Sequence, residues 1–216
     1  MSYHRLIQDA SEHGAAQGHD GSSVDLLSSF GAAPKWRSMF HRDPYQWRIL
    51  SGKWEITPFN RVLCSAEAGT RSGESIAVTG SPRWSDFTLE VTFKLLSQSI
   101  KPPEGGVILF FLFKNFKNYY SCHFCIYKKK IEFIKRVRGV WTVTAEEDFD
   151  AEMQRDYRIA IRTNSGTHQC FIDGTKWMQV RDQDIPQGCV GIGAKYCDVE
   201  FSHVSVSLSG QRNIER

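Results

Sequence analysis

Four residues near the middle of the chain have the types and spacing of a metal site. They are Cys122-His123-Phe124-Cys125, a Cys-x-x-Cys pair that encloses a histidine. Zinc takes thiolate and imidazole ligands, but such a pair usually sits on a turn. On a strand, residues three apart point to opposite faces, and no second pair is spaced to complete a site. We therefore predict no metal site here and expect the six cysteines to be buried, reduced thiols.

A run of carboxylates is the nearest approach to a hydrolytic site. It reads Glu146-Glu147-Asp148-Phe149-Asp150-Ala151-Glu152 and precedes a strand expected at Tyr157. Glycoside hydrolysis needs two carboxyl groups about 5–5.5 Å apart where configuration is retained. We expect this run to be an exposed acidic loop. No Gly-x-Ser-x-Gly elbow, Walker loop or His-Glu-x-x-His motif is present, so the sequence identifies no catalytic residues.

Basic residues cluster at Lys128-Lys129-Lys130 and continue through Lys135, Arg136 and Arg138. Such a cluster can attract a sulfated glycan, nucleic acid or an anionic lipid surface. It also has the composition of a solvated hairpin turn, which we favour because aromatic residues do not interleave with it. The net charge of +3 is mild, so we predict no specific nucleic-acid partner.

Aromatic and polar residues on strand faces and loop ends could form a sugar site, which needs an aromatic platform and a few convergent polar groups. The candidates are Tyr119, His123, Tyr127, Trp141, Arg158, Arg162, Trp177 and Arg181. His123 ranks first because alternation places it on one face with Tyr119, Ser121 and Tyr127. Arg158 and Arg162 follow, as the outward row of a strand expected beside the binding groove. A plain packing role is the alternative for each residue.

The hairpin Gly105–Tyr127 must position most of these residues. Its run Val107–Phe113 is apolar at every position, which is typical of a strand covered on both faces. The hairpin should therefore lie in the middle of a sheet. We expect Val107, Leu109, Phe111 and Phe113 on one face, and Ile108, Phe110 and Leu112 on the other. The run is too short to cross a bilayer as a helix.

From Trp54 onward the chain alternates short strands with Gly, Asn and Pro turns and shows no helical period. The expected strands are 53–56, 62–66, 75–79, 87–95, 107–114, 119–127, 131–137, 141–145, 157–163, 168–172, 177–181, 189–194 and 199–208. Asp173-Gly174 predicts a hairpin turn, and a change of parity predicts a β-bulge near Ser202-His203. The pattern indicates an all-β sandwich or barrel.

Composition divides the chain into three parts. Residues 1–35 form an N-terminal arm with a short helix over 24–30, residues 36–208 a β-sandwich domain, and residues 209–216 a tail. The aromatic segment from Trp36 to Trp54 should pack on the core. The N-terminus has no apolar signal region, which favours a cytoplasmic protein, or an extracellular one if a leader was removed.

The order of these pieces resembles the concanavalin A-like, laminin-G-type jelly roll, in particular its carbohydrate-associated branches. The resemblance covers roughly 40–208 and is carried by 47–54 (WRILSGKW), 85–91 (SDFTLEV), 105–107 (GGV), 118–120 (NYY), 157–159 (YRI), 171–174 (FIDG), 182–192 and 199–201 (VEF). It implies two stacked antiparallel sheets, one concave and one convex. A ligand would then bind on the concave face and the loop rim.

The resemblance also implies two tests for function. Glycoside hydrolases of this fold carry Glu-x-Asp-x-x-Glu, which is absent here. Calcium often braces the fold near the last strand, but Phe201-Ser202 stands where relatives tend to have Phe-Asp, leaving Asp43 and Asp198 as weak calcium candidates. We predict no other cofactor.

The sequence therefore predicts a non-catalytic glycan-binding or adhesion-type module with a glycan or protein partner and no membrane span. An intracellular protein–protein interaction module is the alternative. A glycoside hydrolase-like enzyme with unidentified carboxylates is third.

Overall fold

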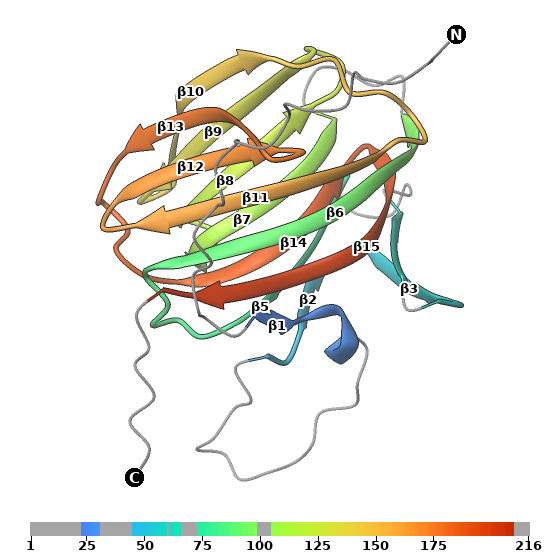
Figure 1. Cartoon of the computed structure of the whole chain (residues 1–216), viewed down its shortest axis with the longest axis horizontal. Helices are drawn as coiled ribbons and strands as arrows, with labels where there is room; N and C mark the ends of the chain where they lie inside the picture. The colour runs from blue at the N-terminus through green and yellow to red at the C-terminus, as the bar shows by residue number, and fades with distance from the viewer. Residues whose placement is uncertain (1–22, 31–44, 60, 66–72, 99–104, 210–216) are drawn as a thin grey trace, which may run out of the picture.

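The computed structural model describes residues 23–30, 45–59, 61–65, 73–98 and 105–209. These residues form two antiparallel sheets that stack face to face as a sandwich (Figure 1). The regular structure is otherwise a single 3-10 turn, Leu27–Ser29, within the described part of the chain. No helix in these ranges is long and apolar enough to cross a membrane. The predicted all-β sandwich is confirmed.

Each sheet joins a run of strands that are consecutive in sequence to strands that are distant in sequence. The eight-stranded sheet has the order β13 (Thr175–Arg181), β12 (Thr167–Ile172), β11 (Asp156–Asn164), β6 (Phe87–Gln98), β15 (Cys197–Leu208), β4 (Arg61–Ser65) and β3 (Lys53–Thr57), and β1 (Ser23–Asp25) pairs with β15. The seven-stranded sheet has the order β10 (Val140–Asp148), β9 (Lys130–Val137), β8 (Asn118–Cys125), β7 (Gly106–Asn115), β14 (Cys189–Lys195), β5 (Glu74–Thr79) and β2 (Arg48–Ser51). Every strand predicted from the sequence is present, while β1 and β2 were not predicted.

Strand β7 occupies the middle of the seven-stranded sheet, and both of its faces are covered, as predicted. Val107, Leu109 and Phe111 enter the main core between the sheets, while Ile108 and Phe110 belong to a second apolar cluster on the outer face.

The prediction for the next two residues of β7 was wrong. Leu112 has φ +50°, and the register with β8 shifts between Phe111 and Asn115. This bulge rotates the chain, so Leu112 joins the core and Phe113 joins the outer cluster.

The predicted helix over 24–30 was also wrong. Ser23–Asp25 pairs with β15 as strand β1, and the Asp25 side chain accepts a hydrogen bond of 3.0 Å from the Leu27 amide, which starts the single 3-10 turn. Leu26 and Phe30 are buried in the main core. This segment packs on the sandwich because strand pairing and apolar burial outweigh local helix propensity.

The aromatic segment was expected to pack on the core, and its described part does. The Trp47 indole donates a hydrogen bond of 2.7 Å to the Leu26 carbonyl, and its ring lies 5.1 Å from that of Phe30. Trp36 lies outside the described residues. The described aromatics therefore fill the main core and do not cover the outer face of β7.

Both predicted local features of the second half of the chain are confirmed. Asp173 and Gly174 take φ +49° and +84° in the β12–β13 turn, the left-handed pair that a two-residue hairpin requires. The register of β15 against β6 shifts between Phe201 and His203, which restores inward parity to Val204.

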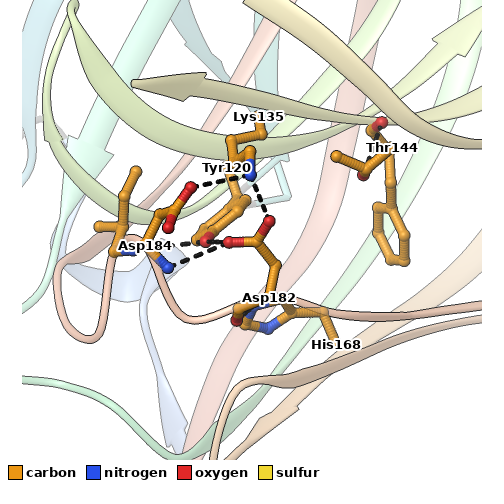
Figure 2. A network of polar contacts seen from close by, with 8 residues as sticks. Tyr120, Lys135, Thr144, His168, Asp182 and Asp184 are labelled. Carbon is orange, nitrogen blue, oxygen red and sulfur yellow. Dashed lines mark hydrogen bonds and ion pairs between the residues drawn. The ribbon is translucent and has the colours of Figure 1, made fainter. Parts of the chain in front are cut away.

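A polar network ties the two sheets together at one end of the sandwich. Figure 2 shows Tyr120 of β8 and Lys135 of β9 both pointing to the carboxylate of Asp182, which directly follows β13. The buried ring of His168 contacts the Asp182 carbonyl through Nε2 at 3.1 Å. Lys135 also pairs with Asp184 at 2.8 Å. The network anchors the inner face of β8, whose outer face carries the candidate site.

Candidate functional site

The outer face of the seven-stranded sheet contains a groove of about 290 Å³. We call it the outer groove. Its lining residues are Glu74, Ile76, Ile108, Phe110, Phe116, Tyr119, Ser121, His123, Cys125, Lys128, Glu132, Arg136, Trp141 and Lys195. The floor at its centre is apolar, since Ile76, Ile108 and Phe110 are nearly inaccessible to solvent. Gly193 of β14 permits this packing, because a Cβ there would lie 2.7 Å from the Ser75 carbonyl and 3.4 Å from the Phe110 ring.

Strand alternation places a row of polar side chains beside this floor. Ser121, His123 and Cys125 all point outward from β8, because their neighbours enter the core. Glu132 lies directly opposite His123 on β9 and is only 2% exposed. Its carboxylate accepts a hydrogen bond from Lys128 Nζ at 3.1 Å, which compensates the buried charge.

An aromatic ring, that of Trp141, forms the rim of the groove on its β10 side. Trp141 of β10 is 47% exposed and pairs in register with Arg136 of β9. Arg136 also lies opposite Tyr119 and hydrogen-bonds to its phenol. Burial raises the pKa of Tyr119, and the Arg136 interactions only partly oppose this effect. The phenol therefore stays neutral at physiological pH and can both donate and accept a hydrogen bond.

The groove carboxylates do not form a hydrolytic pair. Glu74 lies on β5 and pairs with Lys195 at 3.2 Å, whereas Glu132 lies on β9. Four strand spacings separate β5 from β9. At about 4.8 Å per spacing the two positions are about 19 Å apart. Glycosidase carboxylates are at most about 9.5 Å apart.

Three of the eight predicted site residues lie together in the outer groove: Tyr119, His123 and Trp141. Tyr127 does not join them, because β8 ends at Cys125 and Tyr127 is 60% exposed in the following turn. The prediction that Tyr127 shares a face with His123 assumed that this strand continues to residue 127.

The other four predicted residues lie on the eight-stranded sheet, away from the groove. Arg158 pairs with Glu90 at 3.2 Å, and the Arg162 guanidinium lies 4.3 Å from the Phe171 ring centre. Trp177 of β13 packs its ring 5.3 Å from that of Phe149, and Arg181 is exposed at the end of β13. The expectation that the β11 arginines neighbour the groove was wrong, because β11 pairs with β6 and not with the hairpin.

The basic run is neutralised by neighbouring acids. Lys129 pairs with Asp150 at 2.7 Å, Lys130 pairs with Glu146, and Lys128 pairs with Glu132. These pairs support the hairpin-turn interpretation over an anion-binding patch.

The acidic run is only partly the loop that was expected. Its first three residues, Glu146, Glu147 and Asp148, continue strand β10, and Asp150 and Glu152 follow in a loop. All five carboxylate residues are exposed, as expected. Strand pairing of Glu146–Asp148 with β9 explains the longer strand.

Only one of the two calcium candidates lies in the part of the chain that the structure describes. Asp43 lies outside the described residues. The Asp198 carboxylate accepts a hydrogen bond of 2.6 Å from the Ser97 hydroxyl on β6. A calcium site here stays a prediction.

Several groove residues were not among the site residues predicted from the sequence, above all Glu132 and the floor residue Phe110. A signal was available for Glu132. If the turn is centred between Tyr127 and Lys128, antiparallel pairing puts His123 opposite Glu132 and Tyr119 opposite Arg136, as observed. No comparable signal exists for Glu74 and Lys195, because β5 and β14 reach the hairpin only through long-range pairing.

No protein-family model matches the sequence, and no curated protein matches it. Solved structures do match. A carbohydrate binding module, CBM66 from Bacillus subtilis, has 19% identity and a TM-score of 0.62 over 74% of this chain and 94% of its own. The exoplasmic/lumenal domain of VIP36, in a Ca²⁺/Man-bound form, has 16% identity and a TM-score of 0.57 over 78% of this chain and 86% of its own.

A protein described as a native glycosidic hydrolase has 12% identity and a TM-score of 0.61 over 88% of this chain and 96% of its own. At such identities the similarity establishes the architecture and leaves the ligand open. Together with the two stacked antiparallel sheets, it shows that the chain has the concanavalin A-like jelly-roll fold.

Proposed function

We propose that this chain is a glycan-binding module and that the outer groove is its binding site. The observation that carries the proposal is the exposed Trp141 ring at the rim of a groove that also contains convergent polar groups and an apolar floor. A sugar ring presents an apolar C–H face and a rim of hydroxyls. Trp141 can cover the face, while Tyr119 and His123 can exchange hydrogen bonds with the hydroxyls.

Two further facts support a sugar over a simple anion. The groove contains both signs of charge, since Lys128 is paired with Glu132 and Lys195 with Glu74. Paired charges attract a polyanion weakly but can each hydrogen-bond to a hydroxyl. The similar structures named for carbohydrate binding and for bound Man add support from the fold.

A glycan array followed by calorimetry on the best ligand tests the proposal at low and at moderate salt. We expect binding to a neutral glycan that persists at moderate salt, because screening affects only charge attraction. Trp141→Ala should weaken it about tenfold, or about 1.4 kcal/mol. Trp177→Ala is the matched control, since that ring lies on the other sheet, and it should leave the affinity unchanged.

Binding only to sulfated glycans at low salt would contradict the proposal and point to the basic turn. Equal affinity of the Trp141→Ala variant would exclude the outer groove as the site. An array with no bound glycan would reject the function itself.

A second candidate, a protein–protein interaction module, is favoured by exposed apolar residues at the sandwich edge. Phe59 is 91% exposed, and Ile49 and Ile56, on edge strands β2 and β3, are 54% and 49% exposed. The combined variant Phe59→Ser, Ile56→Thr should abolish binding of a protein partner and leave glycan binding intact. If the variant retains a partner that wild type binds, this surface is not the interface.

A further inference from the structure

Three side chains beside the floor of the outer groove place a nitrogen, a sulfur and an oxygen ligand close together. His123, Cys125 and Glu132 each offer one ligand atom, and all three atoms lie within 4.8 Å of one another. The cluster follows directly from the sheet. His123 and Cys125 are two apart on β8 and share a face, and Glu132 pairs with His123 across the β8–β9 ladder.

The separations suit one small cation. Bonds of 2.0–2.3 Å in a tetrahedral site put neighbouring ligand atoms about 3.3–3.8 Å apart. The Cys125 Sγ already lies 3.4 Å from the Glu132 Oε2. The three ligand atoms are at most 4.8 Å apart, so a shift of about 1 Å or less in the histidine side chain would bring its nitrogen into the tetrahedral range.

The chemistry of the three ligands selects the class of metal. Calcium and magnesium prefer six or more oxygen ligands, and this cluster offers one carboxylate. Imidazole, thiolate and carboxylate together suit zinc and similar late first-row cations. Two negative ligands balance a divalent charge once Cys125 loses its proton to the metal.

Metal ligands are usually held in place by a hydrogen bond from a neighbouring residue, and Lys128 provides one to Glu132. Its ammonium bonds Glu132 Oε1 at 3.1 Å, and the other oxygen, Oε2, faces Cys125. A hydrogen bond to the distal carboxylate oxygen orients the ligating one. The carboxylate residue is 2% exposed, so its charge is held in place without being hydrated.

We infer that His123, Cys125 and Glu132 form a three-ligand zinc site whose fourth position opens into the outer groove. Three protein ligands with an open position are the arrangement that leaves room for water or for a ligand oxygen. The inference does not rest on the proposed glycan binding, because the metal is held by the protein alone. Metal binding can therefore be measured without any sugar, and either proposal can fail while the other stands.

Cobalt substitution tests the site on the full chain, without an affinity tag. The chain has seven histidines, so binding by itself would not identify this cluster. A sulfur-to-cobalt charge-transfer band would, because it requires a thiolate ligand. We expect one Co²⁺ per chain with that band, displaced by one equivalent of Zn²⁺. Cys125→Ser should abolish the band and lower Zn²⁺ affinity at least about tenfold.

Cys189→Ser is the matched control, since this buried thiol lies on the same outer face but outside the cluster. It should keep the band and the affinity. Thermal unfolding of each variant without metal checks that the fold is intact. If Cys125→Ser does not fold, Glu132→Gln preserves shape and should give a similar loss of affinity.

Three outcomes would overturn the inference. They are a wild-type cobalt complex without the sulfur band, a Cys125→Ser complex that keeps it, and a Cys189→Ser complex that loses it. Unchanged Zn²⁺ affinity in Glu132→Gln would remove the carboxylate from the site. In each case the cluster would be a hydrogen-bonded part of the groove wall.

Discussion

Lys135 and Asp182 form an ion pair that joins the two sheets of the sandwich. Lys135 lies on β9 of the seven-stranded sheet, and Asp182 directly follows β13 of the eight-stranded sheet. The same carboxylate accepts a hydrogen bond from the Tyr120 hydroxyl, as Figure 2 shows. Because Tyr120 is next to Tyr119 on β8, this pair also fixes the strand that carries the outer groove.

Replacing Asp182 should destabilise the fold. Asp182→Asn leaves the partly buried Lys135 ammonium without its main partner and should cost about 1–3 kcal/mol in the free energy of unfolding. Asp184→Asn is the control: its side chain is 57% exposed, and its loss should cost less than about 1 kcal/mol. Urea denaturation at pH 7 measures both, and equal costs would show that the network is not an inter-sheet lock.

The same carboxylate should contribute to acid sensitivity. Burial alone would raise its pKa, but Lys135 and the Tyr120 hydroxyl outweigh burial and hold the pKa of Asp182 below its usual 3.8. A carboxylate whose pKa is lower in the folded chain than in the unfolded chain contributes stability above the unfolded-state pKa. That stability is lost as pH falls through the folded-state pKa. The unfolding free energy of wild type should therefore fall below about pH 4 more steeply than that of Asp182→Asn. Parallel curves would contradict this assignment.

His168 should make stability depend on pH in a higher range. Burial lowers its pKa below 6.5, and its ring is 1% exposed against Tyr120 and Phe111. Between the folded pKa and 6.5 the unfolded chain binds more protons than the folded chain, so stability falls as pH drops through this window. His168→Gln keeps a donor for the Asp182 carbonyl but does not titrate. Its stability should be nearly flat over this window, and a wild-type slope in the variant would refute the prediction.

Gly106 should tolerate no side chain. A Cβ there would lie 1.8 Å from the Phe124 carbonyl oxygen on the paired strand β8. Gly106→Ala must therefore separate β7 from β8 and should cost about 3 kcal/mol or more. Gly139, in the β9–β10 turn, has φ +87° and open space around its Cβ position, so Gly139→Ala should cost only about 1 kcal/mol of backbone strain. Denaturant midpoints compare them, and a mild Gly106→Ala variant would argue against this strand register.

The cysteines should react slowly in the folded protein. All six are free and buried. Burial raises the pKa of the Cys64 and Cys197 thiols to about 12, which removes the reactive thiolate at pH 8. A disulfide-exchange reagent such as Ellman's should label fewer than one thiol per chain within minutes, and all six after denaturation. Rapid labelling of two or more thiols in the native protein would show that the core opens.

Much of the fold could be predicted from local pattern. The alternation Phe87, Leu89, Val91 identified β6 because a period of two separates the buried from the exposed face. The doubly apolar run of β7 identified a central strand for the same reason. Local pattern failed at Leu112 and Phe113, where a positive φ reverses the parity that alternation assumes.

For the candidate site too, one part follows from local sequence pattern and the rest depends on the tertiary structure. The sequence by itself determined that Tyr119, Ser121 and His123 share a strand face, since that follows from backbone geometry within one strand. Only the tertiary structure decided that this face forms a groove with β5 and β14, and that the β11 arginines lie on the other sheet. Backbone hydrogen bonds between strands are the same for almost every residue type, so they do not specify which distant strands pair. The packing of the whole core sets that pairing.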